Sequence, residues 1–199
     1  GGGGGGRIAL ISTGGSGSWS GNLVFPSGTT NLATFRNAVK ANGGSGNATY
    51  GNGGAGTVYV KHSGLTYGAL IVDNADNAMY ATSGKTLLPS ITGTVSSTGA
   101  NTLNVSSVTP AISSAAWNDI YSGMRLRPDV SSNMGTANDW TDDNVLTVSA
   151  NTTSALTTST AVPSLNGTPT FRTIDLLDHL EITGSAHLES YGDIYIVNG

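Results

Sequence analysis

The densest group of possible metal ligands lies in the segment NDWTDDN. It consists of Asp139, Asp142, Asp143 and Asn144, with Asp129 and Asn133 shortly before it. Calcium prefers several oxygen ligands from carboxylates, amides and backbone carbonyls, and a loop of this composition supplies them. The spacing does not fit an EF-hand, because Gly135 comes one place late and Trp140 stands where a bidentate Glu belongs. Two interpretations stay open: a solvated turn with Asx caps, or a structural calcium held by Asp139, Asp142 and Asp143.

A second group of titratable residues follows later in the chain. Its members are Asp175, Asp178, His179, Glu181, His187 and Glu189. Two carboxylates a few Å apart can hydrolyse a glycosidic bond. Side chains alternate between the faces of a strand, so Asp178 and Glu181 are expected to point to opposite faces. The two histidines lack the spacing of a metal site. We therefore expect this group to form a solvated outer face, and we expect the protein not to be an enzyme.

Other kinds of site find less support in the sequence. Trp19, Trp117 and Trp140 would stack on sugar rings if they were exposed in a row, but large rings also anchor cores. The run Gly1–Gly6 lacks the strand-to-helix context of a dinucleotide site, and no glycine-rich loop precedes Lys-Ser or Lys-Thr. The chain contains no Cys, and no Gly-x-Ser-x-Gly elbow is present. Calcium is thus the one cofactor that the sequence suggests.

The composition favours strands and excludes several classes of function. Charged residues make up 10% of the chain, against about 25% in an average domain. Glycine accounts for 29 of the 199 residues, and Ser, Thr and Asn are also abundant. All four residue types are mediocre or poor helix formers. The net charge of -4 and the scattered basic residues argue against nucleic-acid binding. No apolar run approaches the ~18 residues of a membrane span.

The first part of the chain alternates short apolar runs with glycine-rich turns, the pattern of strands. The runs are Ile8–Ile11, Leu23–Phe25, Thr57–Lys61 and Ala69–Asp73. The segment Asn31–Gly44 fits a helix capped by Asn31 as well as it fits strand alternation, so both remain open. The glycines of Gly43–Gly56 predict turns and a close approach of one backbone layer to the next.

From about Pro89 to Leu165, Ser and Thr replace glycine. Strand alternation is clearest in Thr102–Val108, Met124–Pro128 and Asn144–Ser149, as in an antiparallel module. Later strands are expected at Leu180–Thr183, Ala186–Glu189 and Asp193–Val197, with a spacing short enough for a solenoid coil. We therefore predict an all-β fold: a solenoid in residues 1–88 and 166–199, with a β-rich insertion in residues 89–165.

Three segments resemble a glycine-rich right-handed parallel β-helix family found in large secreted and cell-surface bacterial proteins, including adhesin-like ones. They are GGGGGGRIAL at Gly1–Leu10, GGAGTVYVK at Gly53–Lys61 and ALIVDN at Ala69–Asn74. The resemblance covers about Gly1–Asn77, and Leu180–Gly199 resumes the pattern. It implies that the solenoid is a right-handed parallel β-helix with stacked parallel strands, an extracellular location and an adhesive or structural role. It supplies no catalytic residue.

The sequence-based hypothesis is a non-catalytic extracellular structural protein, a segment of a surface fibre, filament or adhesin stalk. Both Gly1–Gly6 and Ile194–Val197 lack a polar cap, so we expect copies of the chain, or neighbouring segments of a longer one, to cover them head to tail. A glycan is a further possible partner. The alternative is a β-helix module that binds or degrades polysaccharide, which would require Lys61, Arg125, Arg127 and the Asp178 group to converge on one surface.

Overall fold

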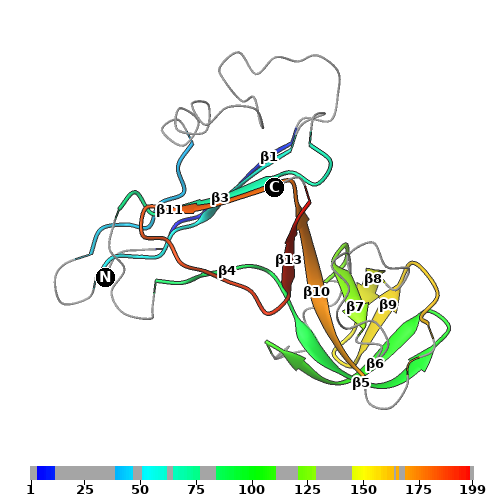
Figure 1. Cartoon of the computed structure of the whole chain (residues 1–199). Coiled ribbons are helices and arrows are strands. Elements are labelled where there is room, and N and C mark those ends of the chain that lie inside the picture. The colour runs from blue at the N-terminus through cyan, green and yellow to red at the C-terminus, as the bar shows by residue number, and fades with distance from the viewer. Residues whose placement is uncertain are drawn as a thin grey trace. The chain divides into compact units, whose positions relative to one another are not determined.

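The computed structural model describes residues 4–11, 39–46, 51–61, 65–76, 84–110, 121–128, 145–163, 165 and 169–197. The chain forms two compact units (Figure 1). The sheet unit comprises Gly1–Leu88, Leu176–Glu189 and Ile196–Gly199. The barrel unit comprises Pro89–Asp175 and Ser190–Tyr195. The barrel unit therefore interrupts the sheet unit in the sequence.

Six antiparallel strands close into a barrel (Figure 1). They are β5 (Thr92–Gly99), β6 (Thr102–Thr109), β7 (Arg125–Pro128), β8 (Leu146–Asn151), β9 (Ala155–Thr158) and β10 (Thr170–Leu177). Their order is β10-β5-β6-β9-β8-β7, and β10 closes the ring by pairing with β7 through Phe171 and Pro128. The strand β13 (Asp193–Ile196) adds to β10.

The predicted right-handed parallel β-helix is therefore wrong. A solenoid stacks strands that run in one direction, whereas each neighbouring pair in the barrel runs antiparallel, including the pairs of β10, which lies in the predicted solenoid segment 166–199. Short apolar runs between turn residues are typical of both architectures. The difference lies in long-range pairing, such as Arg172 of β10 opposite Thr92 of β5. Residue patterns within one strand do not specify such a partner.

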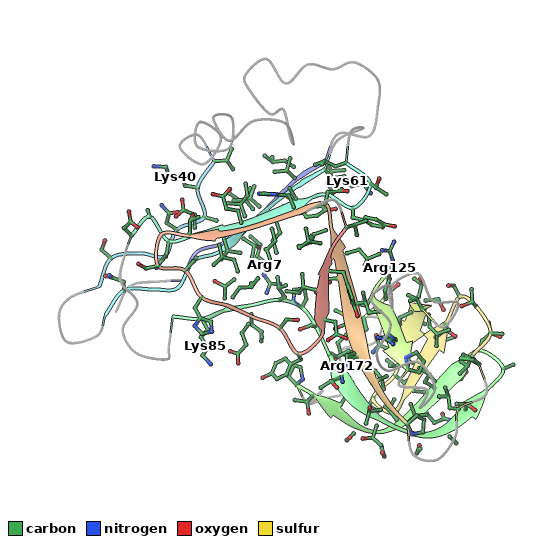
Figure 2. The ribbon with its side chains drawn as sticks, in the orientation of Figure 1. Arg7, Lys40, Lys61, Lys85, Arg125 and Arg172 are labelled. Atoms are coloured by element: carbon green, nitrogen blue, oxygen red, sulfur yellow. The ribbon has the colours of Figure 1, made fainter. Side chains whose placement is uncertain are left out.

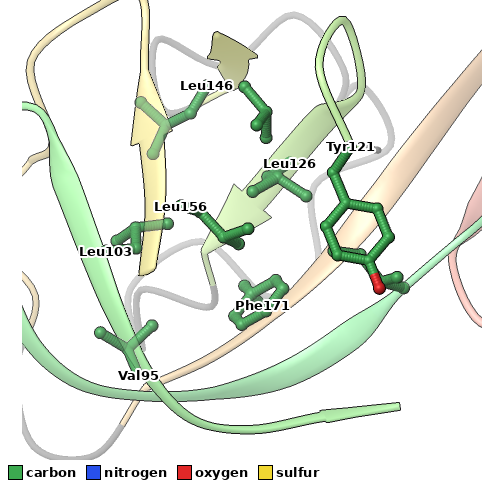
Figure 3. Packing of buried hydrophobic residues seen from close by; sticks show 9 residues of the cluster. Val95, Leu103, Tyr121, Leu126, Leu146, Leu156 and Phe171 are labelled. Carbon is green, nitrogen blue, oxygen red and sulfur yellow. The ribbon is translucent and has the colours of Figure 1, made fainter. Parts of the chain in front are cut away.

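The barrel encloses one hydrophobic cluster. Figure 3 shows side chains from several strands pointing toward one another, with Phe171 of β10 near Leu126 and Leu156. The cluster consists of Ile91, Val95, Leu103, Tyr121, Leu126, Leu146, Val148, Leu156 and Phe171. Leu146 and Val148 alternate with less buried residues along β8, as expected for a strand with one face on the core. Closure pairs both outer strands of the sheet, so the barrel has no open edge between β7 and β10.

The sheet unit holds a four-stranded sheet in the order β1-β2-β3-β11 (Figure 1). Its strands are β1 (Arg7–Ile11), β2 (Thr57–Lys61), β3 (Ala69–Asp73) and β11 (His179–Thr183). The outer pairs β1–β2 and β3–β11 are parallel, but β2 and β3 are antiparallel. A second, two-stranded parallel sheet joins β4 (Thr86–Leu87) to β12 (Leu188–Glu189). The reversal between β2 and β3 is also incompatible with the coil of a parallel solenoid.

The strand register assigns side chains to the two faces of the four-stranded sheet. Ile8, Val58, Ile71 and Glu181 lie opposite one another in one row across the sheet. The next row on the same face runs from Leu10 through Val60 and Ala69 to His179. The apolar members of both rows pack in one cluster with buried Ala41 and Leu65. This face is therefore the core face, and it ends in two titratable residues on β11.

Glycines in the sheet unit bring backbone segments into direct contact. A Cβ atom at Gly5 would overlap the carbonyl oxygen of Ala41, and one at Gly54 would overlap that of Gly84. A Cβ atom at Gly43 would meet the backbone of Gly53 in the same way. The predicted close approach of backbone layers around Gly43–Gly56 is confirmed, because only residues without a Cβ fit between these segments.

Several predicted strands are confirmed, and others were missed. The predicted bounds of β2 and β3 match the structure, and β1, β6, β7, β8, β11, β12 and β13 overlap predicted runs. The strands β4, β5, β9 and β10 were not predicted. The predicted run Leu23–Phe25 and most of Asn31–Gly44 lie outside the described residues.

Candidate functional site

The residues predicted to hold calcium or to bind sugar rings cannot be placed. Asp139, Asp142 and Asp143 lie outside the described residues. So do their neighbours Asp129, Asn133 and Asn144, and the three residues Trp19, Trp117 and Trp140. The calcium site and the aromatic face therefore stay predictions from the sequence. Within the described ranges, no group of three or more His, Cys, Asp or Glu side chains could hold a metal ion.

The carboxylate of Asp178 holds the loop that leads into β3. Its Oδ2 accepts hydrogen bonds from the backbone N–H groups of Tyr67 (2.7 Å) and Gly68 (2.8 Å). The N–H of Asp178 donates in turn to the carbonyl oxygen of Gly68 at 2.8 Å. The residue is only 4% exposed. A buried carboxylate that satisfies two backbone donors positions the main chain, so Asp178 has a structural role.

The remaining members of the second acidic group are spread over several places. Glu181 lies opposite Ile71 on the core face of the sheet, away from the Tyr67–Gly68 backbone that binds Asp178. His187 is exposed, and its carbonyl oxygen accepts a hydrogen bond from the Thr86 N–H at 2.8 Å. Glu189 forms an ion pair with Lys85 at 3.1 Å. Asp178 and Glu181 thus have different neighbours in the described residues: the backbone of Tyr67 and Gly68 for Asp178, and Ile71 for Glu181.

Asp175 carries a perturbed carboxyl group in the barrel unit. Burial raises its pKa from the usual 3.8 to about 6. Its Oδ2 is buried and accepts no hydrogen bond from any residue that the structure describes. An ionised carboxylate without a nearby donor is poorly solvated there, which explains the direction of the shift.

We expect the stability of the barrel unit to rise as the pH falls from 8 to 5. The folded-state pKa of Asp175 lies above the unfolded value, so folding takes up a proton between about pH 6 and pH 4. The gain is about 1–2 kcal/mol, because the carboxyl is partly exposed. Asp175→Asn should be more stable than the wild type at pH 8, and its stability should rise much less between pH 8 and pH 5. Urea denaturation of both proteins at pH 8 and pH 5 measures the difference. Asp76→Asn, at an exposed turn, is the control. Identical pH profiles for the wild type and Asp175→Asn would contradict the assignment.

A polar groove of about 400 Å³ opens in the sheet unit. It is lined by Gly4, Gly5, Arg7, Asn52, Gly53, Gly54, Ala55, Gly56, Thr57, Lys85, Thr86 and Leu87. Figure 2 labels Arg7 and Lys85, its two cationic side chains. Sequence reasoning missed this groove, because Arg7 and Lys85 stand far apart in the chain and neither belongs to a motif. The signal that was available, the repeated glycines of Gly53–Gly56, indicated only close packing.

The basic residues considered for a polysaccharide site belong to different units. Lys61 ends β2 and Asp178 precedes β11, both in the sheet unit. Arg125 and Arg127 lie on β7 of the barrel unit.

In the described residues the arrangement supplies hydrogen-bonding and packing groups. In that part of the chain no helix is long and apolar enough to cross a membrane. A scan against protein-family models and searches of curated proteins and of solved structures find no match to this chain.

Proposed function

We propose that this chain is a non-catalytic structural module that joins copies of itself edge to edge through the four-stranded sheet. One observation carries the proposal. The sheet ends on each side in a five-residue strand, β1 on one side and β11 on the other. Each edge strand carries an exposed isoleucine: Ile11 is 55% exposed and Ile182 is 45% exposed. Both residues are available for contact with a second chain.

Edge strands are natural templates for pairing with another chain. Proteins usually blunt them with Pro, bulges, covering segments or several charged side chains. The strand β1 contains no Pro, and Arg7 is its one charged residue. Its pairing with β2 runs without interruption from Arg7 to Ile11, so it contains no bulge. The exposed side of β1 therefore has few features that oppose strand addition.

The chain directions favour an open assembly. Since β1 is parallel to β2, β2 antiparallel to β3, and β3 parallel to β11, the two edge strands run in opposite directions. A second copy in the same orientation would then place its β11 antiparallel to β1. Antiparallel pairs need no crossover connection and are the more frequent type. Repetition of this unlike-edge contact generates a filament, whereas pairing of β1 with β1 would stop at a dimer.

The use of the acidic group also supports a structural role. The buried carboxylate of Asp178 accepts hydrogen bonds from the backbone N–H groups of Tyr67 and Gly68. Glu189 pairs with Lys85. Asp178 belonged to the carboxylate pair considered for catalysis, and its contacts position the main chain before β3.

The assembly is tested by introducing a charge at one edge. Wild-type particle mass should grow with concentration in light scattering coupled to size-exclusion chromatography, and negative-stain images should show rows of particles. Ile11→Lys and Ile182→Lys should each lower the mass at a given concentration at least several-fold. Ile196→Lys is the matched control, because Ile196 is 41% exposed on β13, outside the four-stranded sheet.

Two results would oppose the proposal. A wild type that stays monomeric over the whole concentration range would exclude edge pairing. Equal masses for Ile11→Lys and Ile196→Lys would show that association uses another surface. A constant dimer that only Ile11→Lys dissociates would replace the filament by a closed β1–β1 pair.

A further inference from the structure

We propose that the glycine-lined groove of the sheet unit binds a uronic-acid unit of an acidic polysaccharide. The groove is built within one chain, so this inference does not depend on edge pairing. Its volume of about 400 Å³ lies within the range of about 300–1,000 Å³ that is usual for small-ligand sites. The argument rests on Arg7, on Lys85 with its partner Glu189, and on the composition of the groove wall.

Arg7 is positioned to receive a carboxylate. It is exposed at the start of β1, and its Nη2 donates to the carbonyl oxygen of Leu87 at 2.9 Å. This bond fixes the plane of the guanidinium while using one of its five N–H groups. A planar guanidinium held in this way suits the two oxygens of a carboxylate, which accept two parallel hydrogen bonds.

Lys85 supplies donors for hydroxyl groups, and its charge is paired with Glu189, which does not line the groove. The two charges are 3.1 Å apart, and their side chains are 36% and 39% exposed. An ammonium group has three donors, so Lys85 can donate to a sugar hydroxyl while it keeps its ion pair with Glu189. Because Glu189 offsets the charge of Lys85, Arg7 leaves one excess positive charge at the groove. That balance favours a monoanionic carboxylate over a doubly charged phosphate.

The groove wall is made largely of peptide groups. Gly53, Gly54 and Gly56 are buried against neighbouring backbone, and the N–H groups of Gly53 and Gly56 and the carbonyl oxygen of Gly54 already form hydrogen bonds within the chain. The charged groups that line the groove are therefore the side chains of Arg7 and Lys85. Among the described lining residues there is no aromatic side chain, which argues against stacking on a nucleobase or on the apolar face of a neutral sugar. Recognition would therefore rest on hydrogen bonds and charge, and a carboxylated sugar offers both.

The test compares a charged and a neutral disaccharide of matching shape. Isothermal titration at low salt should show saturable binding of digalacturonate and binding of digalactose that is at least about tenfold weaker. Arg7→Gln should weaken digalacturonate about tenfold and bring it close to digalactose. Lys85→Gln should weaken both ligands. Lys61→Gln is the matched control, because Lys61 pairs with Ile11, four residues along β1 from Arg7, and does not line the groove.

Thermal unfolding of each variant shows whether Arg7→Gln has lost the fold together with its bond to Leu87. If it has, Lys85→Gln decides the question, because Lys85 is exposed and lies outside the paired residues Thr86 and Leu87 of β4; the proposal then fails if folded Lys85→Gln binds digalacturonate as tightly as the wild type. The proposal is overturned if the wild type does not bind digalacturonate saturably. It is also overturned if folded Arg7→Gln and Lys61→Gln bind it equally, or if digalactose binds as tightly as digalacturonate.

Discussion

Gly56→Ala is expected to unfold the sheet unit, with a loss of more than about 3 kcal/mol. Gly56 is buried directly before β2, and its N–H donates to the carbonyl oxygen of Ala41. A Cβ atom there would overlap the carbonyl oxygen of Gly6 and lie 2.7 Å from the carbonyl carbon of Gly5. Because these neighbours are backbone atoms, no side chain can rotate away to make room. The pairing of β1 with β2 would have to separate.

The glycine-to-alanine substitution at Gly6 provides the control for Gly56→Ala. A Cβ atom at Gly6 meets no described atom within 4 Å, and Gly6 is exposed. Gly6→Ala should be neutral or stabilise by up to about 1 kcal/mol, because alanine loses less backbone entropy on folding. Urea denaturation and amide hydrogen exchange of β2 measure both variants. Equal stabilities for Gly56→Ala and Gly6→Ala would contradict the backbone contacts.

Phe171→Ala should destabilise the barrel unit by about 3–5 kcal/mol. The Phe171 ring is fully buried in the barrel core, and β10 closes the ring at this residue by pairing with both Gly93 and Pro128. Removing the ring leaves a cavity at the point where the sheet closes. The cavity cannot collapse without moving three strands.

Two further variants make this result specific. Phe171→Leu keeps most of the buried volume and should cost about half as much or less, while Thr98→Ala, at an exposed position on β5, should be neutral. Amide exchange separates the units: Phe171→Ala should accelerate exchange in β5 to β9, and Gly56→Ala should accelerate it in β1 to β3. A Phe171→Ala protein as stable as Thr98→Ala would show that the barrel does not close around this ring.

Strands with a clear apolar pattern could be predicted from the sequence. TVYVK of β2 and ALIVD of β3 are runs of β-branched and aliphatic residues between turns, and both were placed correctly. The strand β5 was missed because its sequence TGTVSSTG contains one buried residue, Val95. In β10 the apolar residues Phe171, Ile174 and Leu177 are three apart, which does not resemble strand alternation. Pairing with neighbours on both sides makes these segments strands.

The architecture could not be predicted, because it depends on which strands meet. The barrel closes through residues far apart in the sequence: Thr173 of β10 accepts a hydrogen bond from the Ile91 N–H and donates one back to its carbonyl oxygen. The strands of residues 1–88 and 166–199 were attributed to solenoid coils, and that attribution is wrong, because β2 and β3 run antiparallel and β10 closes an antiparallel barrel.

The chemistry of single residues was equally hard to predict. Asp178 was expected on a solvated face, but it is buried against the backbone of Tyr67 and Gly68. The contact joins residues more than a hundred positions apart, so no local pattern indicates it. The groove around Arg7 and Lys85 is also formed by residues far apart in the sequence, so no local pattern indicates it. The calcium prediction at Asp139, Asp142 and Asp143 remains to be tested.

The interruption of the sheet unit by the barrel unit sets an order of events during synthesis on the ribosome. The strand β3 leaves the ribosome long before its partner β11, since all six barrel strands are encoded between them. The barrel needs no later segment to close, because its first and last segments meet where Thr173 bonds Ile91. The barrel can therefore be complete while β3 still has one open side. A nascent chain thus passes through a stage in which β3 is not yet paired with β11. The rate of elongation through β5 to β10 sets how long that stage lasts.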